Sequence, residues 1–138
     1  MRFMMLVKSA ENSGPPPKEL MDAMAKLGEE AVKSGTMLAT GGLAPTAMST
    51  RIRLARGAIS TMDGPFAETK ELIAGFWLWQ VRSREEAIEW VKRCPNPMHG
   101  ESEIEIRKVY EPEDFASIMP DELREREEQL RAKLARSH

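Results

Sequence analysis

The fold is decided by residues 74–81, which read AGFWLWQV and give the strongest strand signal in the chain. Alternate side chains of a strand point to opposite faces of a sheet. The two faces carry Trp77, Trp79 and Val81 on one side and Phe76, Leu78 and Gln80 on the other. Because apolar side chains occupy both faces, we expect this strand to lie in the middle of a sheet.

Further strands are predicted on both sides of this stretch. Residues 2–8 (RFMMLVK) form a nearly continuous apolar run, which is typical of a second central strand. Shorter strands are expected at residues 37–40, 50–54, 58–62 and 104–109. The strands at 50–54 and 58–62 would form a hairpin, because Gly57 can take a positive φ in their connection. Gly41 and Gly42 are expected to turn the chain after residue 40.

Two helices are predicted to pack on this sheet. The first, at residues 18–34, repeats apolar residues at helical spacing between Pro17 and Gly35, which suit its start and its end. The second follows the strand at 74–81. Its start is indicated by Ser83 and Glu86, which have the spacing of a capping box.

The chain changes character after Pro112, so we divide it into a domain at residues 1–112 and a charged helical extension at residues 113–138. Opposite charges four residues apart recur in the extension and favour a helix. Its apolar face is thin and carries Leu123, Leu130 and Leu134. Because an isolated helix of this length is marginally stable in water, we expect it to pack against the body or against a second subunit.

Composition and charge indicate one globular protein that binds neither nucleic acid nor membranes. A chain of 138 residues is close to the usual size of one domain. Its 20 basic and 22 acidic residues alternate instead of forming the basic stripe of a nucleic-acid binder. No apolar run approaches the roughly 20 residues that span a bilayer. Since Cys94 alone can form no internal disulfide, we expect a cytoplasmic protein.

The predicted elements describe an α+β, ferredoxin-like plan with an added β-hairpin and a charged C-terminal helix. Two helices would cover one face of the sheet. The other face would stay exposed although its strands carry apolar residues, and monomers rarely expose a patch of that size. A homodimer that closes sheet against sheet is the simplest arrangement that buries this face.

Three segments carry a resemblance to a known family. They are residues 63–71 (DGPFAETKE), 75–79 (GFWLW) and 89–95 (EWVKRCP). These segments resemble the YCII-related family in its DGPF-motif branch, and the likeness covers residues 1–109. The resemblance implies a dimeric α+β barrel. It leaves enzymatic activity open: members are often described as candidate enzymes because a histidine and an aspartate lie together in a pocket, and some relatives act on chlorinated aromatic breakdown products.

Asp63 is the candidate catalytic residue. It matches the family aspartate, whereas neither His99 nor His138 matches the family histidine. A carboxylate at the end of a strand can act as a general base if burial raises its pKa. The same Asp-Gly-Pro segment is also a turn signal, in which the aspartate binds backbone amides. Both a chemical and a structural role therefore remain open for Asp63.

The candidate ligand-binding residues are Arg51, Arg53, Lys70, Trp77 and Trp79. Lys70 or Arg51 could hold an anionic group beside Asp63, or could belong to an ordinary solvated surface. Arg53 could pair with Glu105 across a barrel cavity. The two tryptophans could line a pocket for an aromatic ligand, or could pack in the core.

Two functions remain open on these observations. The sequence contains no thiolate cluster, phosphate-binding loop, dinucleotide fingerprint or serine nucleophile elbow, so we expect neither a metal nor a cofactor. The first function is a cofactor-independent enzyme or binder of a small aromatic or acidic molecule in a barrel cavity near Asp63. The second is a non-catalytic accessory or regulatory dimer. Its link to sigma-factor signalling is implied by the resemblance, since family members are often encoded beside alternative sigma factors.

Overall fold

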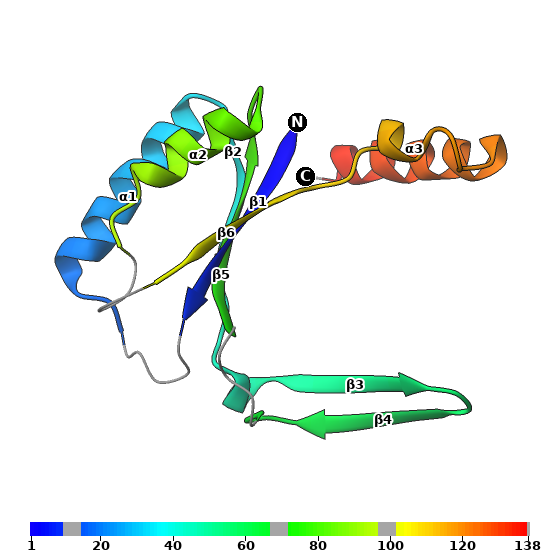
Figure 1. Ribbon diagram of the computed structural model, residues 1–138, viewed down its shortest axis with the longest axis horizontal. Coiled ribbons are helices and arrows are strands. Elements are labelled where there is room, and N and C mark those ends of the chain that lie inside the picture. The colour runs from blue at the N-terminus through cyan, green and yellow to red at the C-terminus, as the bar shows by residue number, and fades with distance from the viewer. Residues whose placement is uncertain (10–14, 67–71, 97–101, 138) are drawn as a thin grey trace.

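The computed structural model describes residues 1–9, 15–66, 72–96 and 102–137. Over these ranges the chain is a mixed α+β structure with a four-stranded sheet, a two-stranded hairpin and three α-helices (Figure 1). The elements are β1 (Arg2–Ser9), α1 (Lys18–Lys33), β2 (Met37–Gly42), η1 (Thr46–Met48), β3 (Thr50–Ala55), β4 (Ala58–Asp63), β5 (Leu72–Gln80), α2 (Arg84–Lys92), β6 (Ile104–Lys108), η2 (Pro112–Phe115) and α3 (Asp121–Arg136). This arrangement is compatible with the ferredoxin-like α+β fold expected from the sequence.

The four-stranded sheet has the order β2-β5-β1-β6, and each neighbouring pair is antiparallel. The two strands predicted to be central, β1 and β5, do lie in the middle. Met5 of β1 is opposite Trp77 of β5, and Phe3 is opposite Trp79. This register places Trp77 and Trp79 of β5 and Phe3 and Met5 of β1 on one face of the sheet.

The core lies between this face and the helices α1 and α2, which cover it from one side (Figure 1). Its buried members are Phe3, Met5, Val7, Trp77, Trp79, Val81 and Ala87. Trp79 is fully buried, and its ring meets that of Trp90 of α2 edge to face, with the centroids 5.6 Å apart. Edge-to-face contact is a favoured geometry for aromatic pairs, so this contact helps to fix α2 on the sheet.

The helix ends follow the sequence prediction in part. Gly35, just beyond α1, has a φ of 75°, which is the left-handed conformation expected there. At the start of α2 the backbone N–H of Glu86 donates to Ser83 Oγ over 3.1 Å. The carboxylate of Glu86 accepts from the backbone N–H of Arg82, not of Ser83, over 2.7 Å, and this bond lowers the pKa of Glu86. The predicted capping box is therefore present only in its first half.

The prediction that Gly41 and Gly42 turn the chain is wrong, because both residues belong to β2. Gly41 is opposite Phe76 of β5, and a Cβ on Gly41 would come within 2.9 Å of the Phe76 ring. The backbone at Gly75 is packed as tightly, since a Cβ added to Gly75 would lie 3.0 Å from the carbonyl oxygen of Gly41. Glycine at positions 41 and 75 allows β2 and β5 to approach each other closely, and β2 continues through Gly41.

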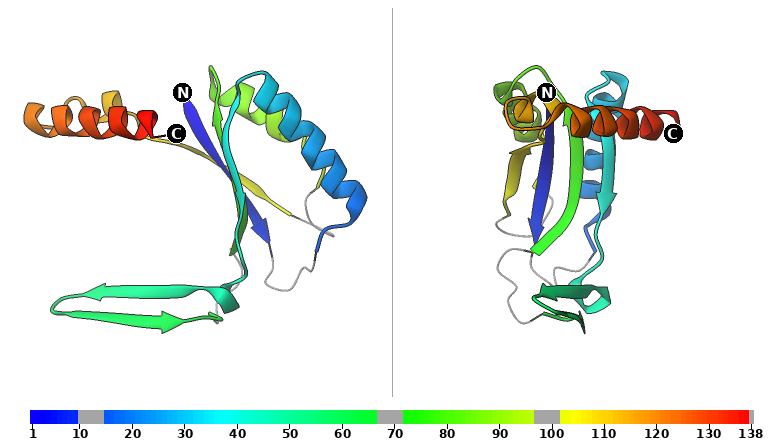
Figure 2. Two further views of the ribbon diagram at one scale, coloured as in Figure 1. Left: turned by 180° about the vertical axis from the view of Figure 1, so that it is seen from behind. Right: turned by 90° about the vertical axis from the view of Figure 1, so that its right-hand side faces the viewer.

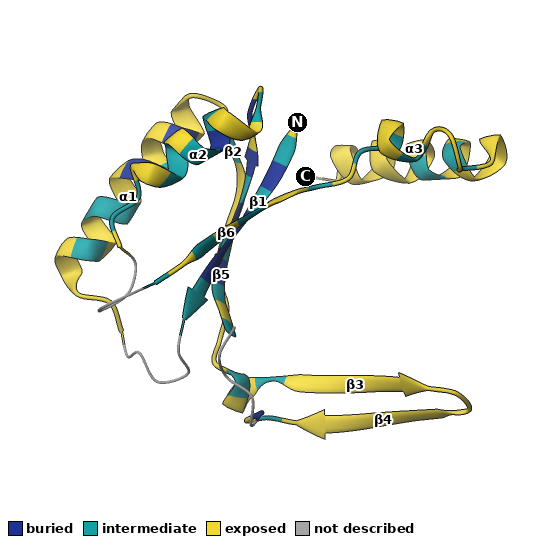
Figure 3. Cartoon of the chain, viewed as in Figure 1, coloured by how far each residue is buried: buried dark blue, intermediate teal, exposed yellow. Residues whose placement is uncertain are grey.

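Two arms leave the sheet on the side opposite α1 and α2, as two views at right angles agree (Figures 1 and 2). One arm is the hairpin β3–β4, and the other is the helix α3. The hairpin is exposed along both strands, and α3 has no buried residue (Figure 3). The leucine face of α3 is therefore not packed against the body within the described part of one chain. The predicted contact with a second subunit stays a prediction.

Candidate functional site

The carboxylate of Asp63 lies at the base of the hairpin. Asp63 is the last residue of β4 and pairs with Thr50, the first residue of β3. The hydroxyl of Thr50 donates a hydrogen bond of 2.9 Å to Asp63 Oδ1. Both side chains are exposed in the single chain. Asp63 therefore closes the hairpin, and one of its carboxylate oxygens is already hydrogen-bonded.

Gly64 brings the hairpin base against the short helix η1. Its backbone N–H donates to the carbonyl oxygen of Ser49 over 2.8 Å. A Cβ on Gly64 would lie 1.7 Å from the carbonyl oxygen of Thr46, a distance that no atom pair tolerates. Only glycine fits at this position, and the sequence pattern had suggested a turn residue without this contact.

Phe66 is the buried residue of the same loop. It is 7% exposed and lies outside the main core cluster. The guanidinium carbon of Arg51 lies 3.8 Å from the centre of its ring, in cation–π geometry. Arg51, a predicted ligand residue, therefore covers the buried ring of Phe66 in the single chain.

Arg53 shares the hairpin face of Arg51, two residues further along β3. It is exposed, and within the described part of one chain no ion pair joins it to Glu105 of β6. The fifth candidate, Lys70, lies outside the described residues. Strand alternation puts Arg51 and Arg53 on the hairpin face opposite to the one that carries Thr50 and Asp63.

Trp77 and Trp79 lie elsewhere, on the sheet face covered by α1 and α2. Their rings stack at 5.6 Å between centroids with an interplanar angle of 21°. Both rings are buried, and Trp79 Nε1 has no hydrogen-bond partner among the described residues. In one chain the two tryptophans are core residues on the far side of the sheet from the hairpin.

The opposite face of the sheet is apolar and is covered by no helix of the described chain, although Leu6 is buried there and Met4, Phe76 and Leu78 are half-buried. Its apolar side chains alternate with those of the core and belong to Met4, Leu6, Ala39, Phe76 and Leu78. Leu6 is opposite Phe76, and Met4 is opposite Leu78, so these four form one contiguous group. Glu105 and Arg107 of β6 lie beside them, opposite Leu6 and Met4. Both arms extend from this side of the sheet (Figure 2).

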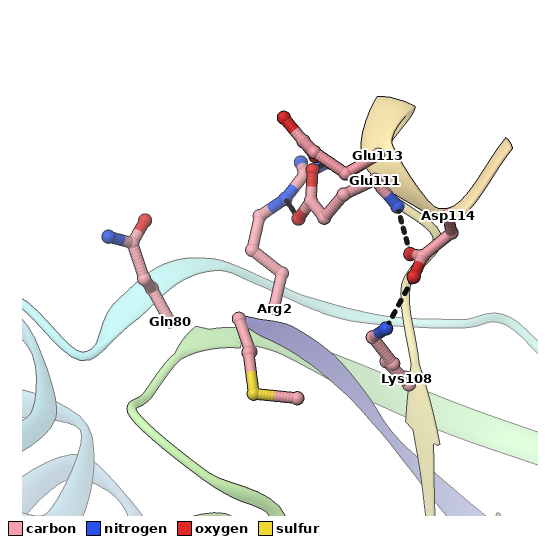
Figure 4. A pocket seen from close by; sticks show the side chains of 7 residues that line it. Arg2, Gln80, Lys108, Glu111, Glu113 and Asp114 are labelled. Carbon is pink, nitrogen blue, oxygen red and sulfur yellow. Dashed lines mark hydrogen bonds and ion pairs between the residues drawn. The ribbon is translucent and has the colours of Figure 1, made fainter. Parts of the chain in front are cut away.

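A pocket of about 440 Å³ lies at the other end of the sheet, beside η2 (Figure 4). Its lining residues are Met1, Arg2, Gln80, Lys108, Glu111, Glu113 and Asp114. None of the candidates from the sequence is among them. The sequence offered little signal for this pocket, because Arg2 and Glu111 are 109 residues apart.

Ion pairs occupy most of the charged groups around this pocket. Arg2 donates twice to the carboxylate of Glu111, over 2.7 and 3.0 Å, and this pairing lowers the pKa of Glu111. Lys108 Nζ lies 2.8 Å from Asp114 Oδ1. The backbone N–H of Glu111 donates to Asp114 Oδ2, and this bond is the main cause of the lowered pKa of Asp114. Carboxylates held ionised in this way suit anchoring of the chain, not proton transfer.

The same anchor reaches α3. Arg131 Nη1 lies 3.5 Å from Glu111 Oε2, which also accepts from Arg2. The charge cluster therefore ties the last turns of α3 to the start of β1. Within the described residues, no group of His, Cys, Asp and Glu side chains could hold a metal ion.

The fold and this surface define a small α+β protein with one sheet face covered by helices and the other left apolar. A model of the YCII-related domain matches residues 1–112, so the chain belongs to the YCII-related family. An uncharacterized protein of Rhizobium meliloti (strain 1021) is 30% identical over 102 residues, which cover 72% of this chain and 82% of that protein. No helix among the described residues is long and apolar enough to cross a membrane.

Proposed function

We propose that two copies of the chain pack their open sheet faces together and bind a small aromatic or acidic molecule in the space enclosed near Asp63. The proposal assigns the chain to the DGPF-motif branch of the YCII-related family, with a dimeric α+β barrel as its assembly. Residues 1–112 form the barrel domain, and residues 113–138 form an extension. The observation that carries the proposal is the apolar open face between two arms.

Burial energetics support the dimer. The open face carries Met4, Leu6, Phe76 and Leu78 as one contiguous group. Removing apolar surface from water stabilises an assembly by about 25 cal/mol per Å². A stable interface removes about 800 Å² from each partner. Two arms that extend beyond this face enlarge the area that a second copy can cover.

The charges near the open face support an acidic or aromatic ligand. Arg51 and Arg53 lie on one face of the hairpin, and Arg107 lies on the open sheet face. Guanidinium groups bind carboxylates in bidentate fashion and stack on aromatic rings. The apolar side chains of the open face would contact the ring of such a molecule, as in most small-molecule sites.

Asp63 is the proton acceptor in this proposal. Its Oδ1 accepts from Thr50, which leaves Oδ2 for a ligand. Coverage by a second copy would remove water from the carboxylate and place it beside the ligand, as a general base requires. The function needs no cofactor, since the charged groups and the base come from the chain.

A ligand screen on the intact protein tests this function. We expect aromatic carboxylates such as benzoates and salicylates to raise the melting temperature of the wild type. Asp63→Asn keeps the hydrogen bond from Thr50 but loses the charge, so it should change the shift given by these acids. Thr50→Val is the matched control, because it removes the hydrogen bond from Thr50 to Asp63 and keeps the carboxylate of Asp63. Identical ligand shifts in wild type and Asp63→Asn would remove the proposed role of Asp63.

A further inference from the structure

Two opposite charges lie side by side at one edge of the apolar sheet face without pairing. Glu105 and Arg107 are two residues apart on β6, so their side chains point to the same face, the one that α1 and α2 leave open. Both residues are exposed. No ion pair among the described residues involves either of them. Within one chain, this face therefore offers one anionic and one cationic group to a ligand.

The sheet beside Glu105 forms an apolar floor that includes an aromatic ring. Across the strands, Glu105 is followed in one row by Leu6, Phe76 and Gly41. The ring of Phe76 lies over Gly41, since a Cβ at position 41 would be 2.9 Å from Phe76 Cε1. Phe76 is only half-buried. Its ring therefore leaves surface on which a second ring can stack in the offset geometry that aromatic pairs favour.

The neighbouring row has the same order from charged to apolar. It runs from Arg107 through Met4 and Leu78 to Ala39. At about 3.3 Å per residue, the two charged residues are about 7 Å apart along β6. Phe76 lies two strand spacings from Glu105, which is about 10 Å. The reach of a glutamate side chain and the length of a phenylalanine-sized molecule together cover this distance.

Closure of this face by a second copy would make both charges depend on a partner. An ionised group that loses water is costly unless it is paired and hydrogen-bonded. A simple carboxylate would pair with Arg107 but would lie beside the carboxylate of Glu105, which repels it. A ligand with an ammonium group next to its carboxylate satisfies both side chains. The two groups of an α-amino acid are attached to one carbon and meet this requirement.

We propose that the open sheet face binds an aromatic α-amino acid. The carboxylate of the ligand pairs with Arg107, its ammonium group pairs with Glu105, and its ring stacks on Phe76. This inference rests on the proposed function, because the ligand occupies the space that two copies enclose. It adds the class of the ligand and the two residues that select it.

Calorimetric titration of the intact protein with three related ligands tests the two charge contacts separately. L-phenylalanine has both charges, L-phenylalaninamide lacks the carboxylate, and N-acetyl-L-phenylalanine lacks the ammonium group. We expect the wild type to bind L-phenylalanine about tenfold more tightly than either derivative, or more, since a hydrogen bond to a charged group contributes that much. Equal dissociation constants for the three ligands would overturn the inference, whether or not any variant folds.

Two charge-removing variants assign each contact to its residue. Arg107→Gln should weaken the binding of L-phenylalanine and of the N-acetyl derivative about tenfold and leave the amide unchanged. Glu105→Gln should weaken the binding of L-phenylalanine and of the amide and leave the N-acetyl derivative unchanged. Arg84→Gln and Glu85→Gln are the matched controls, because these exposed charges lie on α2, on the other side of the sheet. A loss that does not depend on the charge of the ligand, or the same loss in the controls, would contradict the assignment.

The outcome for benzoates separates this inference from the proposed function. A wild type that binds benzoates in a manner that depends on Asp63, but does not bind L-phenylalanine, would overturn the inference and leave the proposed function intact. A wild type that binds neither benzoates nor L-phenylalanine would remove both.

Discussion

The guanidinium of Arg51 lies over the ring of Phe66, 3.8 Å from its centre, and joins the start of β3 to the end of the Asp63-Gly64-Pro65-Phe66 segment. The same segment meets η1 through Gly64 and closes β3 against β4 through Asp63. The motif that looked like an active-site loop therefore also has a structural role, because it fixes the direction in which the hairpin leaves the sheet.

The contact between Arg51 and Phe66 should stabilise the protein. We expect Arg51→Ala to lower the free energy of unfolding by about 1 kcal/mol, within the usual range of a cation–π contact. Arg53→Ala is the matched control, since Arg53 has the same strand and face but no aromatic partner among the described residues, and it should cost less than about 0.5 kcal/mol. Urea unfolding measures both. Equal losses would show that the contact contributes nothing.

Gly64 should tolerate no side chain. Gly64→Ala places a methyl group against the carbonyl oxygen of Thr46, and such overpacking should cost about 2 kcal/mol or more. Gly28→Ala is the control, because nothing lies within 4 Å of its Cβ position on α1, and it should stabilise the protein by about 0.5–1 kcal/mol. Thermal unfolding compares the two. A neutral Gly64→Ala would contradict the close approach.

The pair of Arg2 and Glu111 should give a pH-dependent part of the stability. Arg2 holds the pKa of Glu111 below its ordinary value of 4.5, so the unfolded chain takes up this proton first as the pH falls. The stabilisation is complete above the ordinary value and is lost as the pH falls through the lowered pKa. Glu111→Gln should therefore be less stable than wild type at neutral pH, and the difference should shrink in acid.

Glu113→Gln is the control for this pH dependence. Glu113 lines the same pocket, is exposed and has no ion pair among the described residues. In chemical denaturation, the stability of the Glu113→Gln variant should follow that of the wild type at every pH. If the stability of Glu111→Gln and of Glu113→Gln depended on pH in the same way, the proposed anchoring role of Glu111 would be contradicted.

Cys94 should react slowly. Burial raises the pKa of its thiol to about 11, and its Sγ lies 3.4 Å from Met24 Sδ. The thiol is therefore protonated at neutral pH, and the thiolate is the reactive form. We expect slow labelling by a disulfide reagent in native buffer and fast labelling in urea. Fast labelling of the native protein would contradict the burial.

Local patterns in the sequence predicted the elements well where one segment decides them. The apolar runs of β1 and β5 marked both as central strands, and Gly35 marked the end of α1. Gly41 was misinterpreted as a turn, because the reason for glycine there is the ring of Phe76 on another strand. A contact between distant segments leaves no local pattern.

The candidate site was predicted less completely, for the same physical reason. The alternation of side chains along β5 predicted that Trp77 and Trp79 share one face of the sheet. Only the positions of α1 and α2 decide that this face is buried in the core. The charge cluster around Glu111 depends on Arg2 at the opposite end of the chain. The resemblance pointed correctly to the YCII-related family, whose model matches residues 1–112.

The central claim is that the open sheet face joins two copies, and the molar mass in solution tests it most directly. The chain has a mass of 15.6 kDa, so light scattering of the wild type should give twice this value. Leu78→Glu puts a charge on the open face and should give the mass of one chain. Val32→Glu, at an exposed position of α1, should remain dimeric. A wild type with the mass of one chain, or a Leu78→Glu variant that remains dimeric, would contradict the claim.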